Sequence, residues 1–248
     1  MTGRNTRRTL GILGGLGPLA SAHFYKMVTE RTKADSDAEN LNIIISSRAD
    51  TPDRTEYIMG KSDVSPVPAL IKSAAMLMRA GADVIAIPCN TSHAFFDEIA
   101  ASVCIPVISM IDETADYISR RGFHKTGIMG TDGTLASGIY KKALEKRGIE
   151  YVCPAPETQK LIMSIIYDYV KAGRAGAEEL FRRAADEMLS LGCDSLILGC
   201  TELPLAAYKS DLFINTLEVL AYKSITYCGG TPCGFDDAFM KAYQDEIH

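Results

Sequence analysis

The sequence lacks a long apolar run, an excess of positive charge and any low-complexity segment. The apolar stretch at residues 10–16 is short and rich in glycine, so it is neither a signal-peptide core nor a membrane span. The formal net charge of −5 argues against nucleic acid as a partner, because phosphate binding needs concentrated Lys and Arg. We therefore expect a cytoplasmic protein that binds neither membranes nor nucleic acid.

The cysteines fit neither a disulfide scaffold nor a zinc site. There are seven, an odd number dispersed along the chain, and we find no secretory signal. Cys228 and Cys233 flank a Gly-Gly-Thr-Pro segment, but no second Cys or His pair completes a metal site. Their role, and that of the charged residues Arg48 and Asp50, stays open. The sequence predicts no bound metal.

Short apolar or β-branched runs alternate with longer helical patterns along the whole chain. Alternation of this kind is typical of βαβ units and predicts an α/β fold with parallel sheets. The predicted strands are 10–13, 42–45, 84–87, 107–108, 126–129, 151–152 and 195–198. The predicted helices are 19–31, 67–80, 114–121, 135–146, 159–172 and 177–191.

An internal repeat divides the chain into two similar halves. Residues 11–21 and 127–137 are identical at seven of eleven aligned positions, and both segments form a strand followed by a Gly-rich turn. Further on, residues 81–89 align with residues 192–200, with Gly, Asp and Cys in register. The repeat predicts two pseudo-symmetric Rossmann-like domains.

The repeat places Cys89 and Cys200 at equivalent positions, each just beyond a buried strand. Ligands of open α/β sheets bind outside the carboxyl ends of the strands, so two facing halves would bring both thiols to one cleft. A racemase needs such a pair, because it removes a proton from one face of a carbon and returns one to the other. A polar capping run follows each cysteine, and the start of a helix lowers a thiol pKa. A single cysteine is more often a small buried hydrophobe, but a repeated pair favours catalysis.

Four segments together resemble the aspartate/glutamate racemase superfamily, and its aspartate racemase branch best. They are Gly-Gly-Leu-Gly-Pro at 14–18, Pro-Asp-Arg-Thr at 52–55, Pro-Cys-Asn-Thr-Ser-His at 88–93 and Gly-Cys-Thr-Glu at 199–202. The resemblance implies cofactor-free two-base chemistry, an active site at the domain interface and a homodimer. It also implies that the C-terminal helix returns to the first domain, which gives one domain of residues 1–109 plus 217–248 and a second of residues 110–216.

The same resemblance assigns further site residues. Arg54 corresponds to the family arginine that meets a substrate carboxylate, and Lys171 to a lysine near the substrate. Lys171 could equally be an ordinary helix C-terminal lysine, and the threonines of the second Gly-rich turn could simply cap a helix. Beside the catalytic Cys89 and Cys200, the predicted substrate-binding residues are Gly15, Leu16, Arg54, Asn90, Thr91, Thr131, Thr134, Lys171, Thr201 and Glu202.

We therefore predict an amino-acid racemase, with aspartate as the first candidate substrate and glutamate as the second. Two alternatives stay open: an isomerase of the same superfamily acting on another dicarboxylic acid, and a non-catalytic protein that binds a small anion. A nicotinamide-dependent dehydrogenase is disfavoured. Residues 15–20 fit its Gly-rich fingerprint, but no acidic residue ends the second predicted strand to hold the ribose.

Overall fold

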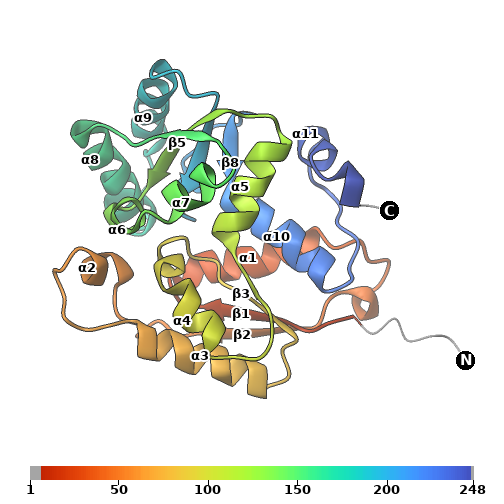
Figure 1. Ribbon diagram of the computed structural model, residues 1–248. Coiled ribbons are helices and arrows are strands. Elements are labelled where there is room, and N and C mark those ends of the chain that lie inside the picture. The colour runs from red at the N-terminus through yellow and green to blue at the C-terminus, as the bar shows by residue number, and fades with distance from the viewer. Residues whose placement is uncertain (1–6, 247–248) are drawn as a thin grey trace, which may run out of the picture.

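The computed structural model describes residues 7–246 as two α/β halves, one above the other, each built on a four-stranded sheet (Figure 1). The strand orders are β2-β1-β3-β4 and β6-β5-β7-β8, and all strand pairs are parallel. The equivalent orders confirm the pseudo-symmetric α/β fold that the repeat predicts. The strands are β1 (Leu10–Gly14), β2 (Ile43–Ser47), β3 (Val84–Ala86), β4 (Val107–Ile108), β5 (Lys125–Gly130), β6 (Glu150–Val152), β7 (Ser195–Gly199) and β8 (Phe213–Asn215).

Helices follow the strands in both halves, and two more come after the last strand. The first half contains α1 (Pro18–Glu30), α2 (Arg54–Ile58), α3 (Val67–Arg79) and α4 (Phe96–Ala101). The second contains α5 (Met110–Arg120), α6 (Asp132–Ser137), α7 (Ile139–Glu145), α8 (Pro156–Ser164) and α9 (Glu178–Ser190). After β8 the chain forms α10 (Thr216–Tyr227) and α11 (Asp237–Lys241).

Two predicted helices are interrupted. The predicted helix 135–146 is two helices, because Gly138 adopts a left-handed backbone (φ 64°) between α6 and α7. The predicted helix 159–172 is α-helical only to Ser164 and continues as the π-helix Ile165–Val170. Such π-helical turns are frequent at functional sites.

The two central strands are buried along their whole length, which explains their continuous apolar sequences. All five residues of β1 and all five of β7 are buried. One apolar cluster continues from the first sheet to the second and includes Ile12, Ile128 and Leu217. The two halves thus share a core, and this core fixes how the ends of β3 and β7 face one another.

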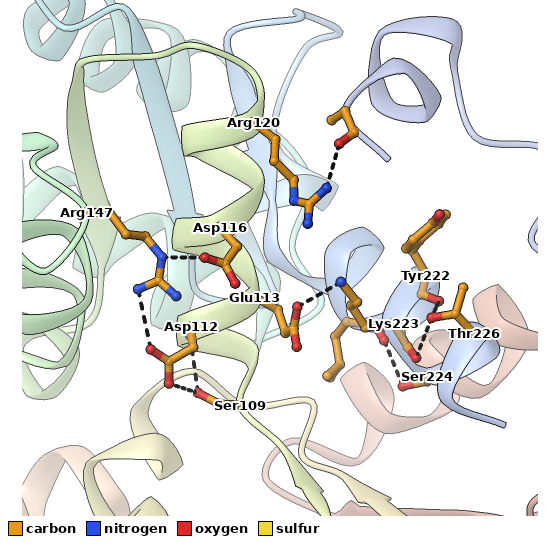
Figure 2. Close-up of polar contacts among 12 residues, drawn as sticks. Ser109, Asp112, Glu113, Asp116, Arg120, Arg147, Tyr222, Lys223, Ser224 and Thr226 are labelled. Atoms are coloured by element: carbon orange, nitrogen blue, oxygen red, sulfur yellow. Dashed lines mark hydrogen bonds and ion pairs between the residues drawn. The ribbon is translucent and has the colours of Figure 1, made fainter. Parts of the chain in front are cut away.

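Polar contacts reinforce the contact between α5 and α10 (Figure 2). The ammonium of Lys223 on α10 lies 3.2 Å from a carboxylate oxygen of Glu113 on α5. Arg147 pairs with Asp116 at 2.6 Å on another side of α5. The helix α10 follows the last strand of the second half and packs on both α1 and α5. The division into residues 1–109 plus 217–248 and residues 110–216 therefore remains a proposal.

Candidate functional site

Cys89 lies just past the carboxyl end of β3, before the 3-10 turn Thr91–Phe95. Its side chain is buried, and the Ser92 hydroxyl donates a hydrogen bond to its sulfur at 3.1 Å. The His93 side chain binds the backbone near Cys89 rather than its sulfur. Its Nε2 accepts the Met110 backbone N–H at 3.0 Å, so its Nδ1 carries the proton and donates to the Cys89 carbonyl at 2.9 Å. Burial lowers the pKa of His93. The neutral imidazole therefore holds the loop after β3 in place through its bonds to the backbone of Cys89 and Met110.

Cys200 occupies the equivalent position directly after β7, with a different partner. Its thiol donates to Glu202 Oε2 at 3.0 Å, and the Thr201 hydroxyl donates to the same oxygen at 2.9 Å. Burial, reinforced by the charge of Glu202, raises the pKa of the Cys200 thiol well above its usual range, while Lys171 opposes the rise. Cys200 is therefore held as a protonated thiol.

Lys171 follows the π-helix and supplies positive charge beside this thiol. Its ammonium lies 4.5 Å from the centre of the Tyr167 ring. Loss of hydration by itself would lower the pKa of Lys171, but the negative charge of Glu202 opposes that effect and the pKa is raised. Lys171 stays a cation, and its place near both Glu202 and Cys200 agrees with the substrate-facing interpretation rather than with a remote helix end.

Arg54 opens α2 and is buried, with most of its guanidinium already in use. Its terminal nitrogens donate to the carbonyls of Leu16 at 2.7 Å, Pro52 at 3.2 Å and Thr51 at 3.4 Å. These bonds fasten the loop before α2 to the first Gly-rich turn. The buried Nε–H has no hydrogen-bond partner within the described residues.

Four buried threonine hydroxyls form a cluster across the two halves. The Thr55 hydroxyl donates to Thr131 at 3.2 Å, and Thr91 lies 3.1 Å from Thr131 and 2.9 Å from Thr134. Thr131 also caps α6 by accepting the Thr134 N–H, so capping and clustering occur together. Sequence reasoning missed Thr55, although it adjoins Arg54 in the Pro-Asp-Arg-Thr segment.

Asn90, predicted to bind substrate, also bridges the halves through its side-chain amide. The hydroxyl of the buried Tyr140 donates to its Oδ1, and its Nδ2 donates to the Thr216 hydroxyl at 3.2 Å. Thr216 in turn donates to the Leu198 carbonyl at 3.2 Å, two residues before Cys200. No sequence motif marks Tyr140 or Thr216, and both were missed.

Gly15 allows a close backbone approach at the first Gly-rich turn. Its φ is +88°, and a Cβ there would lie 2.3 Å from the backbone nitrogen of Arg48. The Arg48 side chain is engaged by Asp50, with Nε 2.8 Å from its carboxylate. Arg48 and Asp50, whose roles the sequence left open, thus pair with each other.

Cys228 and Cys233 lie away from this site. Cys228 is buried at the end of α10, where burial raises the pKa of its thiol to about 12. Cys233 is partly exposed in the segment between α10 and α11. Over residues 7–246 no group of three His, Cys, Asp or Glu side chains could hold a metal ion. No helix in that range has the length and apolar character of a membrane span.

The predicted site residues meet at two connected cavities between the halves. The inner cavity, about 20 Å³, is lined by every predicted site residue except Gly15 and Thr134, together with Asp53, Thr55 and Tyr167. Thr134 does not line this cavity, but its hydroxyl is hydrogen-bonded to that of Thr91, which does. The outer cavity, about 360 Å³, opens from the inner one and includes Gly15 in its wall. Both cysteines line the same inner cavity.

Comparison with known proteins identifies the family of this chain. The family model described as Asp/Glu/Hydantoin racemase matches residues 13–221. The broad specificity amino-acid racemase RacX of Bacillus subtilis (strain 168) is 27% identical over 198 residues, which are 78% of this chain and 85% of that protein.

Solved structures agree with that match. The aspartate racemase of Picrophilus torridus superposes with a TM-score of 0.79 at 28% identity, covering 95% of this chain and 99% of that one. An aspartate racemase homologue from Pyrococcus horikoshii OT3 has a TM-score of 0.73 at 30% identity, covering 90% and 99%. The chain is an isomerase that belongs to the Asp/Glu/hydantoin racemase family.

Proposed function

We propose that this enzyme interconverts the L- and D-enantiomers of amino acids, aspartate first among them, with Cys89 and Cys200 as its two acid/base groups. One observation carries the proposal: thiols from equivalent positions of the two halves line one inner cavity. A carbon held between them would present a different face to each sulfur.

The hydrogen bonds at the two sulfurs run in opposite directions. The Ser92 hydroxyl donates to the sulfur of Cys89, whereas Cys200 donates its own proton to Glu202. Each turnover needs one thiolate and one thiol, and this difference supports Cys200 as the first proton donor and Cys89 as the first base.

In that direction the Cys89 thiolate takes the α-proton of the D-enantiomer, and the electron pair of the broken C–H bond stays on the carbon. The Cys200 thiol then gives its proton to the opposite face, which yields the L-enantiomer and a Cys200 thiolate. The reverse direction exchanges the two roles. The assignment of each sulfur to one enantiomer rests on the family resemblance.

Donors for substrate carboxylates surround the thiols. Arg54 and Lys171 are two cationic residues in the wall of the inner cavity. The threonine cluster adds neutral hydroxyls. Two cationic groups suit an amino acid with a second carboxylate, which supports aspartate and glutamate. Cofactor independence and a homodimer remain proposals taken from the resemblance, and a cytoplasmic location remains an expectation from the sequence.

Replacing either cysteine with Ala tests the mechanism. We expect Cys89→Ala and Cys200→Ala each to lower the racemisation rate of aspartate at least about a hundred-fold, because abstraction without return on the other face inverts nothing. In deuterated water, Cys89→Ala should still exchange the α-proton of L-aspartate with retention, and Cys200→Ala that of D-aspartate. Racemisation is followed by chiral chromatography, and exchange by NMR.

The exposed Cys104 provides the matched control. Cys104→Ala should racemise aspartate at the wild-type rate, which separates the effect of a lost catalytic thiol from that of any cysteine. All proteins are first dialysed against a chelator. Substantial racemisation by Cys89→Ala or Cys200→Ala would rule out the two-thiol mechanism.

A further inference from the structure

The outer cavity has an apolar lining that acid/base catalysis at the α-carbon does not require. Its wall is largely carbon, contributed by Leu16, Pro18, Leu19 and Ala20 from the first half and by Val170 and Leu205 from the second. The charged residues Asp53, Arg54, Lys171 and Glu202 belong to both cavities, whereas His23 and Thr51 are polar residues of the outer cavity alone. The passage thus changes from charged near the thiols to largely apolar in the outer cavity.

Two leucines at this opening are exposed to water. Leu19 on the first turn of α1 is 79% exposed, and Leu205 on the opposite half is 61% exposed. Exposed leucines scattered singly on a surface need no explanation, but this pair lines one cavity from both halves. An apolar group lying between them would cover carbon surface on both sides at once, which is favourable in water.

The sizes of the cavities say which part of a substrate lies there. The inner cavity, with about 20 Å³, has room for a water molecule or two. The outer cavity has about 360 Å³. The reacting carbon must reach the thiols at the inner end, so the rest of a bound amino acid extends outward along the apolar wall.

We propose that the outer cavity is a side-chain subsite and that the enzyme also racemises α-amino acids with long, unbranched apolar side chains. This inference rests on the proposed racemase function. Aspartate would satisfy the charged inner end and leave most of the outer cavity to water. A longer apolar side chain would extend along the surfaces of Leu19 and Leu205.

A homologous series of substrates measures the subsite directly. We expect kcat/KM to rise from L-alanine through L-2-aminobutyrate and L-norvaline to L-norleucine, by about three- to fourfold for each methylene that leaves water. Leu19→Ser and Leu205→Ser should flatten this rise, with the loss growing along the series. Both residues are exposed, so the substitutions leave the core intact.

Leu191→Ser is the control, because Leu191 is 45% exposed and lines neither cavity. It should keep the wild-type dependence on chain length. A flat series in the wild-type enzyme, or a rise that survives in the Leu19→Ser/Leu205→Ser double variant, would overturn the subsite while aspartate racemisation remained. Failure to racemise aspartate as well as every member of the series would instead overturn the proposed function.

Discussion

The contact between Glu202 and Cys200 makes the proposed chemistry sensitive to a single charge. Burial and the Glu202 carboxylate both disfavour the Cys200 thiolate and raise the pKa of that thiol. We expect Glu202→Gln to lower this pKa, because it removes the negative charge and leaves Lys171 unopposed. The active form of the thiol pair has one thiol and one thiolate. With a lower pKa at Cys200 this form exists over a lower pH range, so the bell-shaped dependence of kcat/KM on pH for aspartate should move to lower pH.

The exposed Glu179 on α9 offers a matched charge removal. Glu179→Gln should leave the pH profile of aspartate racemisation in place. If the pH profile of kcat/KM for Glu202→Gln is unchanged or moves to higher pH, Glu202 does not raise the pKa of Cys200 as inferred.

At this scale the sequence predicts the residues of the two loops but not their partners. Cys89 and Cys200 could be found because a repeat puts them after equivalent strands. Tyr140 and Thr216 could not, because they reach Asn90 across 50 and 126 residues of chain, through packing alone. Arg54 was found by resemblance, yet nothing local indicates that three backbone carbonyls take up its terminal nitrogens.

Among the secondary-structure elements, α2 of the first half and α6 of the second are in close contact at the candidate site. A Cβ at Gly133, in the first turn of α6, would lie 2.8 Å from the backbone Cα of Thr55. Gly133→Ala should therefore push the two helices apart and disrupt the threonine cluster. We expect a fall of at least about tenfold in kcat/KM for aspartate and a lower midpoint of thermal unfolding.

The sign of the stability change is diagnostic. Glycine to alanine within a helix is normally stabilising by roughly 0.5–1 kcal/mol, so destabilisation must come from the crowding at Thr55. Calorimetry together with the aspartate assay tests this. A Gly133→Ala enzyme as stable and as active as the wild type would show that α2 and α6 can separate without consequence.

The elements themselves were predicted best where the pattern is strongest. All seven predicted strands are present, because continuous apolar runs flanked by glycine are typical of buried parallel strands. The breaks at Gly138 and after Ser164 were missed, because the apolar periodicity runs on through both. The short β8 and α2 lie in segments where three to five residues give too little pattern to distinguish them from loops.

At the scale of the whole molecule, the ion pair of Glu113 and Lys223 joins α5 to α10, and its substitution tests how much this contact contributes to stability. Their side chains are 16% and 11% exposed. We expect Lys223→Met to cost up to roughly 3–5 kcal/mol in the free energy of unfolding, because it leaves the largely covered Glu113 without this cation. Glu113→Leu/Lys223→Met should recover most of that loss. Denaturant unfolding of the two single variants and the double variant measures the coupling.

An exposed pair on α7 gives the comparison. Lys141 and Glu145 are each 54% exposed, so Lys141→Met should cost at most about 1 kcal/mol. Equal effects at Lys141 and Lys223 would mean that the α5–α10 contact is not held by its buried charges. The repeat predicts the two sheets of the molecule, whereas this contact depends on α10, which carries no repeat signal.

The unequal partners of the two sulfurs, Ser92 at Cys89 and Glu202 at Cys200, have a consequence for the kinetics of any enantiomeric pair. Two enantiomers have the same free energy in water, so the equilibrium constant of racemisation is one. The Haldane relation then forces kcat/KM to be equal in the two directions, however different the two faces of the site are. The asymmetry between a serine and a glutamate can therefore appear only as kcat and KM that differ between enantiomers in the same proportion. The enantiomer with the lower KM must therefore also be the one with the lower kcat.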